Sequence, residues 1–188
     1  MSEHPYRLAV IVASTREGRF APVITNWFTR HAAQHPHLDV DVIDLDAVRP
    51  YELRHGSAEY ETFAKRVDEA DAFVVITPEY NHSFPAPLKH AIDLLHRQWQ
   101  AKPVGFVSYG GVSGGLRAVE QLRLVFAELH ATTVRETVSF ALAGSLFDDA
   151  GRLRDPAPAT QAADALLRQL TWWALALREA RTARPYGA

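Results

Sequence analysis

The sequence contains no cysteine, which excludes disulfide bonds, thiolate metal sites and cysteine nucleophiles. It has no apolar run of membrane-spanning length, and residues 1–5 lack the basic and apolar regions of a secretory leader. Acidic and basic residues nearly balance, with a formal net charge of −2, so charge favours neither nucleic acid nor an anionic membrane as partner. We therefore expect a soluble, cytoplasmic protein.

Two phosphate-binding signatures are also missing. Neither Gly-Lys-Ser/Thr of the P-loop nor G-x-G-x-x-G of the dinucleotide-binding turn occurs anywhere in the chain. A triphosphate or a dinucleotide held in the usual way is therefore not expected.

Short apolar runs alternate along the chain with segments of helical periodicity. Strands are predicted at 8–13, 38–45, 72–76, 104–108 and 132–140. Helices are predicted at 22–35, 59–70, 88–95, 116–129 and 163–180. The strand at 38–45 alternates apolar residues with aspartates, which is typical of a half-exposed edge strand. Residues 49–57 are expected to be irregular.

Alternating strands and helices predict a doubly wound parallel sheet with right-handed crossovers. We predict one α/β domain over residues 1–188 (a length sufficient for a substantial core), with a flavodoxin-like five-stranded sheet in the order 2-1-3-4-5. Ligands of such sheets bind beyond the carboxyl ends of the strands, at the switch point. The loops 14–19, 78–85 and 108–115 follow strands 1, 3 and 4, so we expect them to converge there.

The first of these loops is rich in hydrogen-bond donors. Ser14, Thr15, Arg16 and Arg19 precede the N-terminus of a predicted helix. Backbone N–H groups, hydroxyls and guanidinium groups at such a position can cradle one phosphate group. The alternative is an ordinary turn with two solvated arginines.

The other two loops suit a flat ligand. Prolines stiffen the second loop, where Tyr80 offers a ring face or a hydroxyl and Asn81 an amide. Its alternative is a rigid structural turn. The third loop can approach a ligand closely through its four glycines, although plain turn chemistry also explains them. These glycines are Gly110, Gly111, Gly114 and Gly115.

The loop sequences resemble a known family. Residues 13–19 (Ala-Ser-Thr-Arg-Glu-Gly-Arg) and 78–83 (Pro-Glu-Tyr-Asn-His-Ser) resemble the NAD(P)H-dependent FMN reductases, which include quinone, azo-dye and chromate reductases. Residues 114–123 and 146–156 are similar to later parts of the same family. The resemblance implies a flavodoxin-like fold, non-covalently bound FMN, NAD(P)H as co-substrate, and a homodimer or homotetramer.

The resemblance also implies roles for individual residues. Those expected at the FMN phosphate are Ser14, Arg16, Arg19, Phe20 and Ala21. Those expected along the isoalloxazine ring are Pro78, Glu79, Tyr80 and Asn81. Those expected at its pyrimidine edge are Ser108, Tyr109, Gly110 and Gly111. The chain departs from the family at Ala13, where glycine is common, and at 19–21, where some members have Ser-Phe-Asn.

A reductase of this kind needs no acid or base from a side chain. NAD(P)H would pass hydride to the flavin, and a quinone, azo compound, metal oxyanion or second flavin would then take two electrons in a ping-pong sequence. Backbone N–H groups of 109–111 would stabilise negative charge near flavin N1 and O2. An FMN-dependent electron carrier or a redox sensor with little turnover is the alternative. The sequence does not identify the electron acceptor, nor does it decide whether NADH or NADPH is the preferred donor.

A serine hydrolase is excluded although Ser113 lies in a G-x-S-x-G stretch. That class requires an acid and then a histidine after the nucleophile. Only His130 follows, with no aspartate in between, and Glu120 and Glu128 lie on the intervening predicted helix, too close in sequence to form a separate acid loop.

Histidines and tryptophans raise two further alternatives. His31 and His35 have zinc-binding spacing and His37 follows, but the sequence shows no partner helix with a carboxylate. Favourable interaction with the helix dipole explains them, so no metal is predicted. Trp172 and Trp173 are expected in the core or at a dimer contact. The helix at 88–96 is expected at a dimer interface beside the flavin.

Overall fold

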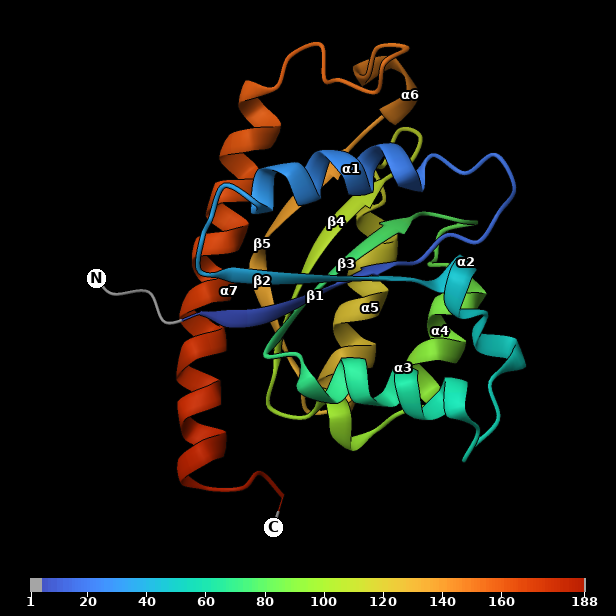
Figure 1. Cartoon of the computed structure of the whole chain (residues 1–188). Helices are drawn as coiled ribbons and strands as arrows, with labels where there is room; N and C mark the ends of the chain where they lie inside the picture. The colour runs from blue at the N-terminus through green and yellow to red at the C-terminus, as the bar shows by residue number, and fades with distance from the viewer. Residues whose placement is uncertain (1–4, 188) are drawn as a thin grey trace.

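The computed structural model describes residues 5–187, and its five strands join one parallel sheet. The strands are β1 (Tyr6–Val12), β2 (Leu38–Asp44), β3 (Ala72–Pro78), β4 (Pro103–Tyr109) and β5 (Thr132–Phe140). Their order is β2-β1-β3-β4-β5, and every neighbouring pair is parallel (Figure 1). The predicted flavodoxin-like α/β fold is therefore confirmed.

Burial varies across the sheet as the strand order requires. Strands β3 and β4 are buried along their whole length, because helices cover both of their faces. At one edge, β2 has only Ile43 fully buried, which confirms the predicted edge strand.

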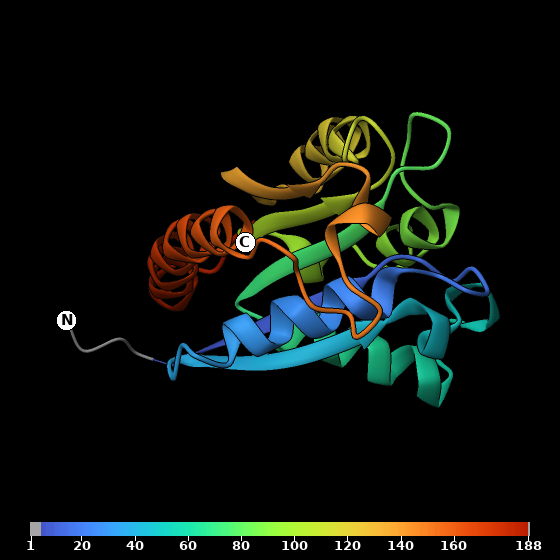
Figure 2. The ribbon, with the colours of Figure 1, turned by 90° about the horizontal axis from the view of Figure 1, so that it is seen from above.

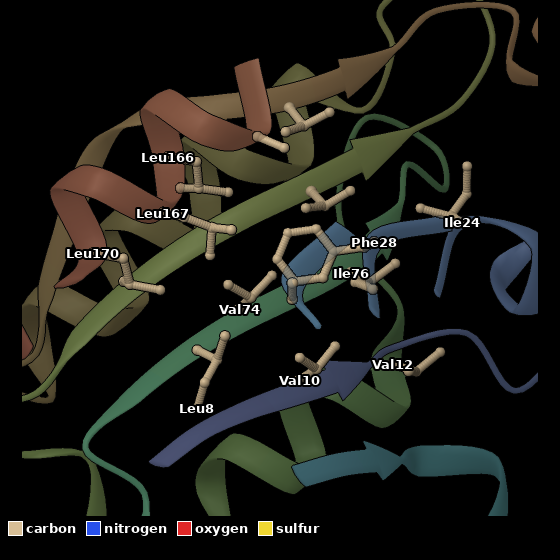
Figure 3. Close-up of a cluster of buried hydrophobic side chains, with 14 of the residues drawn as sticks. Leu8, Val10, Val12, Ile24, Phe28, Val74, Ile76, Leu166, Leu167 and Leu170 are labelled. Atoms are coloured by element: carbon tan, nitrogen blue, oxygen red, sulfur yellow. The ribbon is translucent and has the colours of Figure 1, made fainter. Parts of the chain in front are cut away.

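Helices pack on both faces of the sheet (Figure 1). One face carries α1 (Ala21–Ala32) and α7 (Ala157–Ala183), and the other carries α3 (Ala58–Glu69), α4 (Ala86–Asp93) and α5 (Leu116–Glu128). Figure 3 shows side chains of α1 and α7 meeting those of the central strands. The helix side chains labelled there are Ile24, Phe28, Leu166, Leu167 and Leu170, and the strand side chains are Leu8, Val10, Val12, Val74 and Ile76.

Several short helices were not predicted. They are α2 (Leu45–Val48), η1 (Pro50–Glu52), η2 (Arg97–Trp99) and α6 (Ala143–Leu146). Each is about one turn long, too short for a hydrophobic period to show. In contrast, α7 is longer than the predicted 163–180 and has Pro158 in its first turn, where proline is tolerated. Among residues 5–187, no helix has both the length and the apolar character that crossing a bilayer requires.

The surface bears on two expectations, that α4 lies at a dimer interface and that Trp172 and Trp173 lie in the core or at a dimer contact. The apolar residues Leu88 and Ile92 of α4 are fully buried against the sheet, while Lys89 and Asp93 form an ion pair on its outer face. Helix α4 thus has no surplus of apolar side chains, and the oligomeric state stays a prediction. Trp172 and Trp173 are 63% and 38% exposed, so their expected place in the core is wrong.

Candidate functional site

The first two loops meet through the side chain of Tyr80. Its hydroxyl shares a 2.7 Å hydrogen bond with Ser14 Oγ, and Ser14 is fully buried at the end of β1. The guanidinium carbon of Arg16 lies 3.5 Å from the centre of the Tyr80 ring, within cation–π range. The loops after β1 and β3 are therefore in direct contact, as predicted.

The second and third loops meet through the carboxylate of Glu79. Ser113 Oγ donates a 2.7 Å hydrogen bond to Oε2, and Arg117 donates from its backbone N at 3.1 Å and from Nη1 at 3.0 Å. The N–H of Glu79 in turn donates to the carbonyl of Tyr109 at 3.2 Å. All three loops therefore lie together, and the hydroxyl of Ser113 is bound to a carboxylate rather than placed as a nucleophile.

Glu79 also stabilises the N-terminus of α5. That helix begins after Gly115, which has no side chain with which to cap it, and a carboxylate from a distant loop accepts one of its first N–H groups instead. Burial alone would raise the pKa of Glu79, but hydrogen bonds from Ser113 and Arg117 outweigh it. The pKa consequently lies below its ordinary value, and Glu79 stays ionised.

Replacing Glu79 by glutamine is expected to destabilise the protein by about 1–2 kcal/mol at pH 7, because charge-assisted hydrogen bonds become neutral ones. The pKa of Glu79 is lower in the folded protein than in the unfolded chain, where a glutamate has a pKa of about 4.3. The stabilisation by Glu79 is therefore complete above that pH and is lost as the pH falls. Urea unfolding should show the difference shrinking below about pH 4. The matched control is Glu120→Gln on the exposed face of α5, expected within about 0.5 kcal/mol. Equal losses in both variants would contradict this role.

A tight turn presents the tip of the second loop. Tyr80 and Ser83 exchange backbone hydrogen bonds of 2.8 and 3.0 Å, and the two residues between them have positive φ, 50° at Asn81 and 71° at His82. Two left-handed central residues are characteristic of a type I′ turn. The side chain of Gln121 braces it, since Nε2 donates to the His82 carbonyl and Oε1 accepts from Ser83. Asn81 is exposed at the tip.

Arg19 has a structural contact that the sequence did not predict. Its guanidinium makes two hydrogen bonds to Asp44, at 2.6 and 2.8 Å, and a third to the carbonyl of Ser14 at 2.7 Å. The hydrogen bond to Asp44 is the main reason why the pKa of Arg19 is raised. Arg19 thus ties the first loop to the end of β2, and its contact with a phosphate stays a prediction. Arg16 is the exposed arginine of this loop.

The start of α1 is suited to an anion. Phe20 occupies the cap position without a side-chain hydrogen bond to the helix, Ala21 is the first helical residue, and the first turn has no acidic residue. The first N–H groups of α1 and the positive end of its dipole therefore lie where the first loop ends, at Phe20. The centres of the Phe20 and Phe147 rings are 5.5 Å apart, so the Phe20 ring packs on a neighbouring aromatic side chain, and its place at a phosphate stays a prediction.

Tyr109 provides a buried polar atom at the same edge of the sheet. Its side chain is 6% exposed, and its hydroxyl makes no hydrogen bond of good geometry among residues 5–187, although the Ser14 hydroxyl is close enough to lower its pKa slightly. Burial raises the pKa of Tyr109, with the nearby Tyr80 adding to the shift, so the hydroxyl keeps its proton. A buried hydroxyl without a well-formed hydrogen bond to the protein is a natural donor to a ligand.

The third loop packs against a segment that sequence reasoning did not include. The N–H of Gly110 donates to the Phe140 carbonyl at 3.2 Å, while the carbonyls of Gly110 and Gly111 accept from Ala143 and Leu142. Figure 2 shows the chain after β5 passing over the start of α1. The Gly110 amide is therefore occupied by protein, which corrects the expectation that it faces a ligand.

Pro78 is the last residue of β3 and Ser108 the last but one of β4, and both are buried beneath the loops. Ser108 is fully buried, and its hydroxyl donates to the Gly114 carbonyl at 2.8 Å, so it holds the loop in place instead of facing outward. Pro78 is buried at the end of β3, in register with Tyr109 on β4.

The chain is similar in sequence to proteins of known family. Residues 6–144 match the family model described as NADPH-dependent FMN reductase. The chain is 31% identical over 166 residues to a quinone reductase of Pseudomonas putida, covering 80% of this chain and 86% of that protein. It is 32% identical over 124 residues to an NAD(P)H-dependent FMN reductase of Schizosaccharomyces pombe, covering 58% of this chain and 60% of the yeast protein.

Solved structures share the fold at lower identity. The flavoenzyme NAD(P)H:(acceptor) oxidoreductase FerB of Paracoccus denitrificans has a TM-score of 0.72 at 20% identity, covering 90% of this chain and 97% of that one. General stress protein 14 of Treponema denticola, solved in complex with FMN, has a TM-score of 0.59 at 16% identity, covering 90% and 99%.

Proposed function

This chain belongs to the NADPH-dependent FMN reductase family, and we propose that it binds FMN non-covalently where its three loops meet. With FMN it would pass two electrons from NAD(P)H to a small acceptor. The observation that carries this proposal is the contact of Ser14 and Arg16 with Tyr80, which joins a site for an anion to a surface for a flat ring. Relatives described as quinone reductases make a quinone the first acceptor to test.

The residues present fit the phosphate of FMN. The uncapped N-terminus of α1 offers backbone N–H groups and a positive dipole end, and Ser14 and Arg16 belong to the loop that leads into it through Phe20 and Ala21. Each charge-assisted hydrogen bond contributes roughly 1.5–3 kcal/mol, so a few of them anchor a dianion.

The second and third loops fit the isoalloxazine ring. The Tyr80–Ser83 turn is rigid and carries exposed Asn81, as a surface that positions a planar group should. The Tyr109 hydroxyl is a protonated donor that makes no hydrogen bond of good geometry among the described residues. With the Gly110 amide occupied, we assign the donor at the pyrimidine edge to the N–H of Gly111.

In this proposal the protein residues position the FMN and provide the charged and polar groups around it. Bound FMN supplies the redox chemistry, taking hydride from the nicotinamide and giving two electrons to the acceptor. The chain holds the phosphate at α1, orients the ring with the Tyr80–Ser83 turn and keeps the Tyr109 proton in place. Since nicotinamide and acceptor would use the same open face, we propose a ping-pong sequence.

The purified protein tests this proposal directly. Bound oxidised flavin should give absorption bands near about 370 and 450 nm. Steady-state oxidation of NADH and NADPH with a quinone should give parallel double-reciprocal plots. Flavin bands without turnover would instead favour the electron carrier or redox sensor, and absence of flavin binding would reject the site.

Arg16→Ala is expected to weaken FMN binding by roughly 1.5–3 kcal/mol, because one charge-assisted partner of the phosphate is lost. Fluorescence titration of the apoprotein measures it. Riboflavin, which lacks the phosphate, should bind the wild type and the variant alike. The matched control is Arg30→Ala, which removes an exposed arginine at the other end of α1. Unchanged FMN affinity in Arg16→Ala would contradict the phosphate assignment.

A further inference from the structure

A cluster of metal-ligating side chains lies between α1 and α7. His31 stands in the last turn of α1, His35 lies three residues beyond the end of that helix, and Asp164 reaches both from α7. One ligand atom from each lies within 4.8 Å of the others. The carboxylate that the sequence did not reveal is 133 positions away from His31 and arrives only through the fold.

We propose that these three residues bind one divalent transition-metal ion, with zinc as the best match. Two imidazoles and a carboxylate are ordinary zinc ligands, with water completing a tetrahedral site. Ligand atoms about 2.1 Å from a tetrahedral zinc ion are roughly 3.4 Å apart. Asp164 Oδ1 lies 2.8 Å from His31 Nε2 and 3.8 Å from His35 Nε2, so the observed spacings bracket that value.

The surroundings favour a cation and hold the ligands in place. The cluster is at the C-terminal end of α1, where the helix dipole attracts positive charge. The Trp27 ring stacks on that of His31, with an interplanar angle of 6°, and so fixes its orientation. The side chain of His31 is only 9% exposed, whereas His35 and Asp164 are 30% and 38% exposed and leave a path for the ion and its water.

The position of the cluster predicts its role. Helix α1 has 12 residues and is thus about 18 Å long, with the proposed phosphate site at its other end. The ion would therefore take no part in electron transfer. It would link α1 to α7 and stabilise the folded chain, since metal held by two helices binds the native state in preference to the unfolded one.

Isothermal titration calorimetry of the untagged, chelator-treated full chain with zinc chloride tests this site. One ion should bind per chain with micromolar or tighter affinity. His35→Gln and Asp164→Asn, both partly exposed positions, should each weaken binding on the order of tenfold or more. The matched control is His96→Gln, which removes a histidine from a pair elsewhere in the fold, His96 and His130, and should change nothing.

Thermal unfolding provides a second readout. Zinc at about a hundred times its dissociation constant should raise the Tm of the wild type by roughly 5–10 °C and that of Asp164→Asn much less. Melting without metal shows whether the variants fold. The proposal is overturned if submillimolar zinc gives no saturable heat, or if the His35 and Asp164 variants bind zinc like the wild type.

Discussion

Replacing Gly115 by alanine is expected to destabilise the protein by about 3 kcal/mol or more. Gly115 has a φ of +86°, and a Cβ placed there would lie 2.7 Å from the Cβ of Ser108 and 2.9 Å from the backbone N of Tyr109. The left-handed backbone alone costs an alanine about 1–2 kcal/mol. The clash adds to this because a strand backbone must move. Urea unfolding measures the change.

The matched control is Gly111→Ala in the same loop. A Cβ at Gly111 would meet no atom of residues 5–187 within 4 Å, and its φ is not in the left-handed region. Its stability should therefore stay within about 0.5 kcal/mol of the wild type. Similar losses at both positions would mean that the loop tolerates no side chain at all, and that the contact with Ser108 is not the cause. Gly115→Ala should also lose flavin, since Glu79 and Tyr109 lie beside this turn.

Sequence periodicity predicted the five strands and the helices between them, and a flavodoxin-like strand order then predicted the meeting of the loops. The apolar run at 72–76 and the loop after it fall where β3 and its turn lie. Periodicity did not predict contacts between residues that are far apart in the sequence. The pairing of Arg19 with Asp44, for example, depends on the register that places Asp44 opposite Val12 at the carboxyl end of β1. A sequence pattern carries no register between strands separated by a helix.

The same limit explains the remaining site residues. Glu79 was expected along the ring of a flavin, but its carboxylate is turned toward Ser113 and Arg117, 34 and 38 positions later. Leu142 enters the left-handed region with a φ of 50°, which leucine rarely adopts, so the turn that brings its N–H to Gly111 has no sequence signal.

Asn81→Ala is expected to slow reduction of the bound flavin by NAD(P)H on the order of a hundredfold. Asn81 has a φ of 50° in a turn whose two central residues are both left-handed. Asparagine accepts this conformation more readily than alanine does, so the substitution strains the turn. A displacement of about one ångström at a group that aligns the flavin with the nicotinamide is sufficient for such a loss. FMN should remain bound, because the proposed phosphate contacts, Ser14 and Arg16, lie in a different loop.

Asn81→Gly separates the shape of the turn from the side-chain amide. Glycine adopts positive φ without strain, so this variant keeps the turn and removes the amide. Stopped-flow absorbance near about 450 nm should then show reduction within about tenfold of the wild-type rate. A glycine variant as slow as the alanine variant would assign the effect to the amide itself. If the alanine variant is reduced at the wild-type rate, the Tyr80–Ser83 turn does not align the flavin, and the assignment of this turn to the ring fails.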